Sequence, residues 1–125
     1  MAFAFEISRA ARRACIRAEG RIDLETSLAA GYRLARDPRI GDDFHVLIDM
    51  RGSSWKLSCD EAMDLATAVA QMPRQEGKVA LLVNQVGLAQ ARIFCDLAAA
   101  HGFDVMPFER TEDAHRWLSI GRSVQ

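Results

Sequence analysis

The chain has 125 residues, half of them hydrophobic and about a quarter charged, and 16 Lys and Arg against 17 Asp and Glu leave a formal charge of −1. This length suits one domain around a single hydrophobic core, so we expect residues 1–125 to form one domain. Proteins that bind the phosphate backbone of nucleic acids normally have a basic excess, so the charge balance argues against that class.

The cysteines indicate a reducing compartment. Cys15, Cys59 and Cys95 are odd in number, widely spaced and free of CxxC pairs. This pattern argues against both a disulfide framework and a zinc site, so we expect buried structural thiols, no metal, and a cytoplasmic location. The apolar runs are far shorter than the roughly 20 residues of a membrane span, so we expect no integral membrane segment.

Two strands are predicted at the start of the chain. Phe3, Phe5 and Ile7 alternate with small or polar residues, and residues 13–19 alternate in the same way. Period-two alternation is typical of strands, and the two segments together predict an antiparallel hairpin. The Ala and Arg content of residues 9–18 suits a helix equally well, so that stretch stays open between strand and helix.

The period becomes helical after Asp23. Leu24, Leu28 and Tyr32 recur at helical spacing, Asp23 is a good N-cap residue, and the dipeptide at 37–38, Asp-Pro, ends the helix. Residues 44–50, FHVLIDM, are apolar on both alternating faces and predict a central strand buried on both sides. A charged turn that contains Gly52 is expected directly after Met50.

The second half of the chain predicts three more helices and two more strands. Ser58 and Glu61 form a capping box for a helix that Pro73 ends, and residues 78–83, KVALLV, predict a buried strand. A helix over 87–100 follows, with Gly102 as its C-cap residue. Residues 103–108 predict an edge strand, because Pro107 removes a backbone donor. Thr111 is expected to cap the last helix. Strands that alternate with helices predict parallel pairing of the later strands.

Three sequence blocks suggest a family. They are VLIDMRG at 46–52, KVALLV at 78–83 and FERTEDAHRWL at 108–118. In this combination the chain resembles the SpoIIAA-like family, relatives of the STAS domains of anti-sigma-factor antagonists and sulfate transporters. The resemblance implies an α/β fold: a mixed β-sheet with an N-terminal antiparallel hairpin, then parallel β-α units, with helices covering the sheet. It also implies a bacterial cytoplasmic protein, and the same fold resembles the lipid-binding domain of Sec14-type carriers.

The regulatory serine of the anti-sigma-factor antagonists is not carried over. In that family a phosphorylatable serine stands beside an aspartate at the start of the helix after the central strand. Residues 49–54 of this chain read DMRGSS and lack the adjacent Asp-Ser pair. Phosphorylation remains a minor alternative, since a phosphate at a helix N-terminus is electrostatically favoured. Its candidate acceptors are Ser53, Ser54 and Ser58.

No signature of catalysis is present. His45, His101 and His115 form no HxH or HxxxH pair, and the sequence has no GxSxG, GxGxxG or Walker motif. An enzyme that uses Asp49 with Arg51 would lack a paired base and nucleophile. We therefore expect neither an enzyme nor a cofactor.

The candidate binding site is a polar rim at the carboxyl ends of the parallel strands, where open α/β sheets bind ligands. The same residues have a structural interpretation, in which Asp49 and Arg51 cap backbone groups or pair with each other at the surface. Trp55 either covers the sheet edge or anchors a partner. The rim comprises Asp49, Arg51, Ser53, Ser54, Trp55, Asn84, Gln85 and Arg92.

These observations predict a non-enzymatic regulatory or protein-binding module of STAS-like type. Its expected partner is another protein or a second copy of the chain, as a homodimer through an edge strand or a helix face. The alternative is a carrier or sensor of a small hydrophobic or lipid-like ligand, which the fold relation and the position of Trp55 favour.

Overall fold

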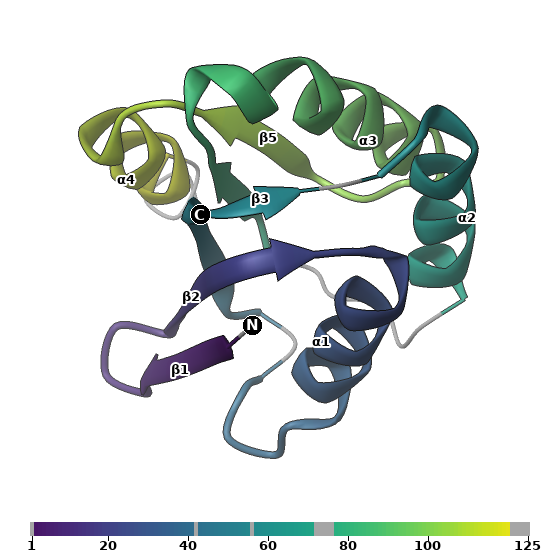
Figure 1. Cartoon of the computed structure of the whole chain (residues 1–125). Coiled ribbons are helices and arrows are strands. Elements are labelled where there is room, and N and C mark those ends of the chain that lie inside the picture. Colours follow the sequence, from purple (N-terminus) through teal and green to yellow (C-terminus); the bar gives the residue numbers. More distant parts are fainter. Residues whose placement is uncertain (1, 42, 56, 72–76, 121–125) are drawn as a thin grey trace.

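A mixed five-stranded sheet forms the centre of the described structure. The computed structural model describes residues 2–41, 43–55, 57–71 and 77–120, without the side chains of Ala2 and Trp55. The strands lie side by side in chain order (Figure 1): β1 (Ala2–Ser8), β2 (Arg13–Ile22), β3 (His45–Trp55), β4 (Val79–Leu82) and β5 (Val105–Phe108). β1 and β2 pair antiparallel and the other neighbours pair parallel. The predicted fold class is confirmed.

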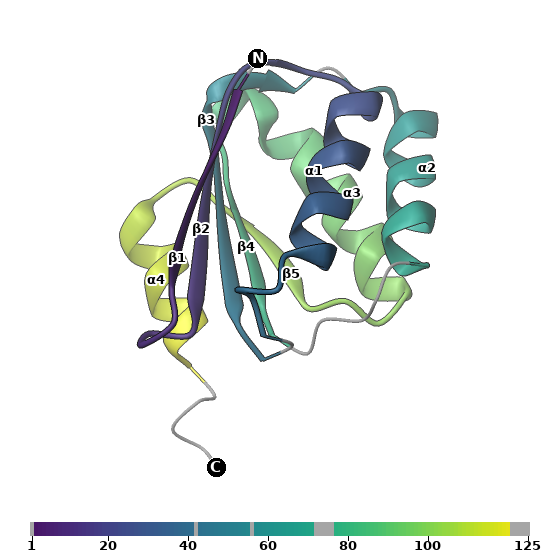
Figure 2. The same ribbon diagram turned by 90° about the horizontal axis from the view of Figure 1, so that it is seen from below.

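The helices cover the two faces of the sheet unequally. Figure 2 shows α1 (Leu24–Arg36), α2 (Cys59–Ala70) and α3 (Leu88–Ala100) on one face, and α4 (Thr111–Ser119) on the other. A short 3-10 helix, η1 (Gln85–Gly87), leads into α3. The larger core lies between the sheet and the first three helices, and a smaller one lies beneath α4. Among the described residues, α4 packs on β4 and β5 and reaches Arg13 and Cys15 at the start of β2, and it leaves β1 and the end of β2 uncovered.

The stretch over residues 9–18 is a turn followed by a strand. Residues 9–12 form the turn, in which Arg12 has a positive φ of 51°, and β2 begins at Arg13. Ala14, Ile16 and Ala18 are buried in alternation along β2. Pairing with both β1 and β3 satisfies the backbone of this segment, and tertiary contacts thereby override the helical propensity of Ala and Arg.

Local capping signals determine three of the helix ends. Asp23 accepts a hydrogen bond from the Thr26 amide, and Ser58 and Glu61 form the predicted capping box, so both predicted N-caps are confirmed. Gly102, with φ of 90°, follows the end of α3 as predicted. The cap predicted at Thr111 is wrong, because α4 already begins at Thr111 and Arg110 is its N-cap residue. Pro73 lies outside the described residues, and α2 ends at Ala70.

Strand β3 is longer than predicted. We expected it to end at Met50 in a turn, but it continues to Trp55. Arg17 of β2 pairs with Asp49 whereas Glu19 pairs with Gly52, so three residues of β3 advance against two of β2. This register shift is a β-bulge, which bends a strand and often lies beside a functional site. The expected turn is wrong because β2 continues to Ile22 and supplies backbone partners for residues 53–55.

The junction of β3 and β4 is closely packed. The Lys78 amide donates to Nδ1 of buried His45 over 2.8 Å, and the Val46 amide donates to the Lys78 carbonyl over 2.8 Å. A Cβ on Gly77 would overlap the carbonyl oxygen of Phe44, so only glycine fits there. His45 is thus engaged in holding the start of β4.

The two edges of the sheet differ. β5 is one edge strand and contains Pro107, as predicted, and it has four residues. β1 is the other edge strand, has seven residues and contains no proline.

Candidate functional site

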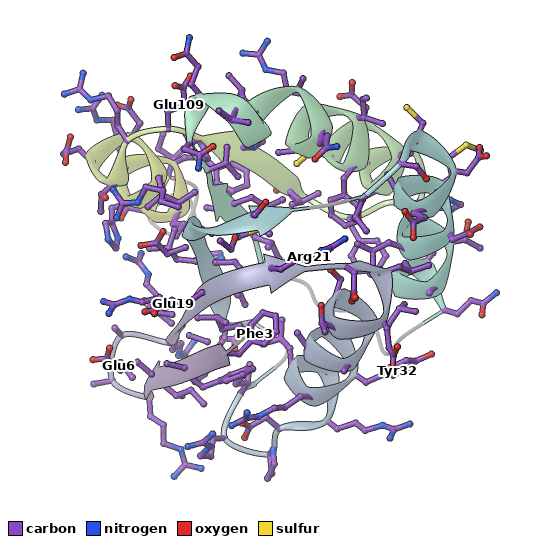
Figure 3. All side chains as sticks on the ribbon, in the orientation of Figure 1. Phe3, Glu6, Glu19, Arg21, Tyr32 and Glu109 are labelled. Carbon is purple, nitrogen blue, oxygen red and sulfur yellow. The ribbon has the colours of Figure 1, made fainter. Side chains whose placement is uncertain are left out.

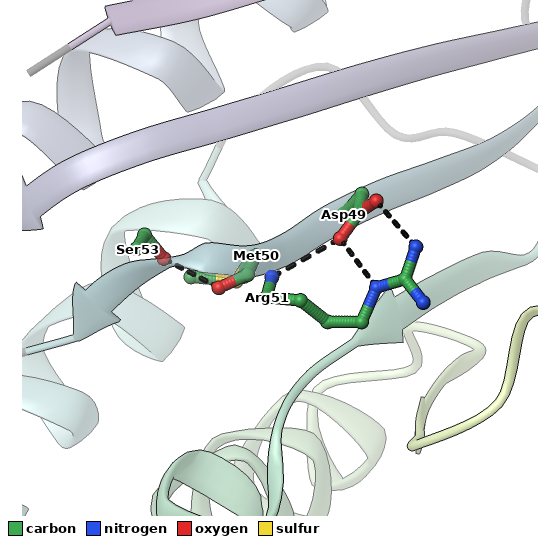
Figure 4. Close-up of polar contacts among 4 residues, drawn as sticks. All are labelled: Asp49, Met50, Arg51 and Ser53. Carbon is green, nitrogen blue, oxygen red and sulfur yellow. Dashed lines mark hydrogen bonds and ion pairs between the residues drawn. The ribbon is translucent and has the colours of Figure 1, made fainter.

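Asp49 and Arg51 form a bidentate ion pair at the bulge of β3 (Figure 4). Arg51 Nε donates to Asp49 Oδ1 over 3.1 Å, and a terminal guanidinium nitrogen donates to Oδ2 over 2.9 Å. The Arg51 amide also donates to Oδ1, over 3.0 Å. The surface pairing that was one of the two interpretations of these residues is therefore confirmed. The Arg51 side chain remains 46% exposed, so its outer face is still open to a partner.

The charges around this pair keep Asp49 ionised. The hydrogen bonds from Arg51 lower the pKa of the Asp49 carboxyl, against a smaller opposing effect of burial, and the positive charge of Arg17 lowers it further. A carboxylate held in this way is a poor general base, because its conjugate acid is too strong. It is suited to recognition of a positively charged or hydrogen-bond-donating group.

Two residues near this pair were missing from the predicted rim. Arg17 lies directly opposite Asp49 in the register of β2 and β3. Glu112 of α4 raises the pKa of Arg51 through its negative charge. The alternation of β2 was the sequence signal that could have placed Arg17 on this face. Glu112 had no such signal, because its position depends on how α4 packs.

Two of the four serine and amide residues of the predicted rim, Ser53 and Asn84, are engaged with the backbone. Ser53 Oγ donates to the Met50 carbonyl over 2.7 Å, and Asn84 Oδ1 accepts from the Gly87 amide over 3.0 Å as the N-cap of η1. Ser54 and Gln85 are exposed. Because Leu82 pairs with Asp49, β4 ends at the level of the ion pair, and Asn84 follows it within two residues.

One described member of the predicted rim, Arg92, is not brought to the ion pair. Arg92 lies in α3, which packs on the face of the sheet opposite α4 (Figure 2). Arg51 lies on the α4 side, where the negative charge of Glu112 raises its pKa. Trp55 pairs through its backbone with Ile22 at the end of β3, and its side chain lies outside the described residues. Ser58 is exposed, and its Oγ already accepts from the Glu61 amide over 3.1 Å.

The histidines and cysteines are dispersed through the fold. His115 Nδ1 lies 2.8 Å from a guanidinium nitrogen of Arg13, and His101 is exposed at the end of α3. Burial raises the pKa of Cys95 to about 12 and also raises that of half-buried Cys15, whereas Cys59 is exposed. Among the described residues, no three His, Cys, Asp or Glu side chains form a group that could hold a metal ion. None of the described helices combines the length and apolar character needed to cross a membrane.

An apolar recess of the described structure forms a chamber between the sheet and the first three helices. Its volume is about 190 Å³, and its lining exposes mostly apolar atoms. Phe3 of β1 lies on the side of the sheet that faces α1 (Figure 3) and forms part of the wall. Ser27 is the one lining residue with a polar side chain. Other wall residues come from α1 (Ala30, Gly31, Leu34), the sheet (Ile16, Ile48, Leu81) and α2 (Leu65, Val69).

The chamber lies where small residues of α1 face the sheet, between leucines of the same helix that pack against the core. α1 has an apolar face but no buried residue, whereas α2 and α3 each bury several. Its residues toward the sheet are small, including Ala30 and Gly31, so they leave space above the strands. The sequence analysis did not identify this site. The small residues on the inner face of an amphipathic helix were a signal, but their meaning depends on the distance between helix and sheet.

Comparison with known proteins supports the fold. No protein-family model matches the chain, and neither does any curated protein sequence. Among solved structures it is similar to an uncharacterized protein of the DUF3478 family with a SpoIIAA-like fold from Shewanella loihica PV-4. The identity is 19%, 94% of this chain and 92% of that chain are covered, and the TM-score is 0.59. It is also similar to the anti-sigma factor antagonist SpoIIAA in its unphosphorylated form, at 18% identity over 95% of this chain and 100% of that one, with a TM-score of 0.48.

The first of these similarities shows that the chain has a SpoIIAA-like fold. The resemblance drawn from the three sequence blocks is thereby confirmed at the level of fold. The third block has a clear physical role in the structure. Ala114 and Leu118 of α4 are fully buried against the sheet, and the ring centroids of Phe108 and Trp117 lie 5.6 Å apart.

Proposed function

We propose that this protein is a non-enzymatic binding module that holds a small hydrophobic ligand in the chamber beneath α1. The observation that carries the proposal is the chamber itself, with about 190 Å³ of space behind a mostly apolar wall. Protein interiors are normally packed as densely as organic crystals, with few voids larger than a water molecule. The chamber is partly open at the surface, so its apolar wall is accessible to water, and covering that wall with an apolar ligand is favourable.

The size and lining of the chamber define the class of ligand. Pockets for drug-sized molecules have volumes of roughly 300 Å³ or more, whereas an apolar cavity of about 150 Å³ binds benzene. The chamber therefore suits a neutral molecule with one or two rings, or a short aliphatic chain. Ser27 offers a hydroxyl for a single hydrogen bond, and no charged side chain lines the wall, so a charged head group would have to remain outside.

The titratable residues support a role without catalysis. His45 is engaged at the start of β4, and Asp49 is kept ionised by Arg51. The thiols of Cys15 and Cys95 have raised pKa values, which lowers the fraction present as reactive thiolate. Binding without reaction is the function that these groups favour.

Titration of the full chain with indole, a neutral two-ring probe, tests the proposal. Methyl resonances of Leu34, Ile48 and Leu65 should shift together and saturate with one molecule per chain. Native mass spectrometry of freshly purified protein should show any ligand that was retained from the cell. If indole, naphthalene and hexanol all leave these methyl groups unshifted, the chamber is not a binding site.

Filling the chamber provides the matched control. Gly31→Leu places a side chain in the chamber and should abolish indole binding while the fold is kept. Ala29→Leu adds a similar side chain on the exposed face of the same helix and should leave the binding unchanged. Equal loss of binding in both variants would mean that α1 is perturbed as a whole, and equal retention would place the indole elsewhere.

A regulatory protein partner is the second candidate function, favoured by the charged face that α4 leaves uncovered. Figure 3 shows Glu6 and Glu19 on this side of β1 and β2, away from α1. Arg17 is exposed beside them, and the Asp49 and Arg51 pair continues the row on β3. Alternating charges of this kind favour specificity for a partner with the complementary arrangement.

Reversing the charge of one arginine on each side of the sheet distinguishes binding of a protein partner from binding of a small ligand in the chamber. A partner bound through the α4 face should be lost with Arg51→Glu and kept with Arg92→Glu, because Arg92 lies in α3 on the other side. Indole binding should be unchanged in both variants. Co-purification of the same protein with all three forms would exclude this face as the contact.

A further inference from the structure

The outer edge of β1 is the most open backbone surface of the described structure. β1 is an edge strand of seven residues, and Figure 2 shows no helix or loop across its outer side. Natural proteins usually protect such edges with proline, lysine, a bulge or a very short strand. The edge at β5 has two of these features, Pro107 and a length of four residues. β1 contains neither proline nor lysine, and Glu6 is its one charged residue.

We propose that β1 pairs antiparallel with β1 of a second copy, so that two sheets join into one continuous sheet across a twofold axis at Phe5. A closed pair of identical edge strands must be antiparallel, because the same residues contact each other from both sides. With the axis at Phe5, Phe3 lies opposite Ile7 of the second copy, and Ala4 lies opposite Glu6. This inference goes beyond the proposed function and does not depend on a ligand.

The side chains on the α1 side of β1 suit this pairing. Phe3, Phe5 and Ile7 are only partly buried and point to the same side. In the paired state Phe5 would meet Phe5 of the second copy, and aromatic pairs directly opposite each other stabilise neighbouring strands. The Phe5 ring is already held from α1, where the guanidinium carbon of Arg33 lies 3.9 Å from the ring centroid.

The charges on the other side of β1 select the register. Ala4 pairs with Arg17 within one chain, and in the proposed register Glu6 of the second copy takes the opposite side of Ala4. Neighbouring strands lie about 4.8 Å apart, so Glu6 and Arg17 stand about 10 Å apart at the backbone, across a small alanine. Both side chains are long enough to meet above it. This contact occurs twice, once on each side of the axis.

The register with its axis one residue further along β1, at Glu6, is unfavourable. With the axis at Glu6, the two carboxylates would face each other directly, and like charges at opposed positions destabilise strand pairing. The shift would also move Phe5 away from its counterpart. The registers are therefore distinguishable by experiment.

Sedimentation equilibrium of the full chain over micromolar concentrations tests the pairing. Wild type should fit a monomer–dimer equilibrium, and Glu6→Arg should raise the dimer dissociation constant by about tenfold, because two attractive contacts become repulsive. Glu109→Arg is the matched control, since Glu109 is equally exposed but lies after β5 at the other edge. It should leave the constant unchanged. A monomeric wild type at every concentration would overturn the proposal.

Cross-linking tests the register independently of affinity. In a background with Cys15→Ala and Cys59→Ser, Ala4→Cys and Glu6→Cys are prepared as separate proteins and mixed under mild oxidation. The mixture should form a disulfide-linked dimer faster than either protein alone, because only residues 4 and 6 lie directly opposite each other. Thermal unfolding of each variant at low concentration verifies that the monomer is folded. Equal cross-linking in all three samples would refute a twofold axis at Phe5.

Discussion

The two faces of the sheet differ in how completely the covering helix buries its side chains. Beneath α4, Ala80, Ala114 and Leu118 have no or almost no exposed surface, and the nine residues of this helix seal their part of the face. Beneath α1, a helix of thirteen residues, none of the helix residues is buried, and a chamber of about 190 Å³ remains. Both helices are amphipathic, so the difference lies in the size of the residues that meet the sheet and not in the apolar pattern.

Truncation of one leucine on each face should give the largest contrast. Leu118→Ala removes a fully buried side chain and should lower the free energy of unfolding by about 3 kcal/mol. Leu34→Ala enlarges a space that already exists around a half-buried residue, so it should cost about 1 kcal/mol or less. Urea denaturation of the two variants measures both values, and equal losses would contradict the contrast between the faces.

Removal of the Lys78 ammonium should loosen the α4 face alone. Lys78 Nζ donates to the Trp117 carbonyl over 3.0 Å and lies 4.9 Å from the centroid of the Trp117 ring. It also donates to the Ile120 carbonyl, so it holds the C-terminal end of α4. Lys78→Met keeps the aliphatic stem and should lower the free energy of unfolding by about 1 to 2 kcal/mol.

Hydrogen exchange tests where the effect of Lys78→Met is located. Amides in the last turn of α4 should exchange faster, whereas those of α1 and α2 should not change. Faster exchange throughout the protein would mean that Lys78 acts on the whole fold through the junction of β3 and β4.

Filling the chamber should stabilise the α1 face. Gly31→Leu replaces the weakest helix former except proline and covers apolar wall atoms, so we expect a gain of about 1 kcal/mol or more in unfolding free energy. Gly31→Ala separates the gain in helix propensity from the gain in apolar contact. Alanine supplies most of the helix propensity but adds only one methyl group to the chamber. Thermal unfolding in the absence of ligand compares them, and a lower melting temperature for Gly31→Leu would show that the chamber is too narrow for the side chain.

The ion pair at the bulge should give the smallest effect, and a pH-dependent one. Arg51 lowers the pKa of Asp49 in the folded protein below the ordinary value of 3.8, so the pair contributes stability above that pH. The contribution is lost as the pH falls through the lowered pKa. Because both side chains are partly exposed, screening by solvent keeps it small. Arg51→Met should move the titration of the Asp49 carboxyl carbon back toward 3.8 in NMR spectra, and an unchanged titration would mean that another group lowers the pKa.

Features that depend on neighbouring residues in the chain were predicted well. The caps at Asp23 and Ser58 follow from hydrogen bonds that span three residues, and the edge position of β5 follows from the missing donor of Pro107. The paired sheet and the alternation of helices followed from periodicity. The bulge was missed because Arg51 and Gly52 have the composition of a turn, and only pairing of residues 19–22 of β2 with residues 52–55 continues the strand.

Residues of the predicted rim lie on opposite sides of the sheet, and this too depends on pairing between segments that are distant in the chain. Asp49 and Arg51 lie on the α4 side of β3, and α3 carries Arg92 on the other side. The end of a strand predicts how far along the strand direction a residue lies. It does not predict on which face of the sheet the side chain lies. The face depends on the register of each strand, and one bulge changes it for every later residue of β3.

The amino-acid sequence by itself determined the order of strands and helices, the caps, the protected edge at β5 and the class of fold, because each depends on short-range hydrogen bonding or on the period of apolar residues. Only the tertiary structure decided the continuation of β3, the Arg17 and Glu112 neighbours of the ion pair, and the chamber beneath α1. These depend on contacts between segments far apart in the chain, and the chamber lies where small side chains of α1, Ala30 and Gly31, face the strands.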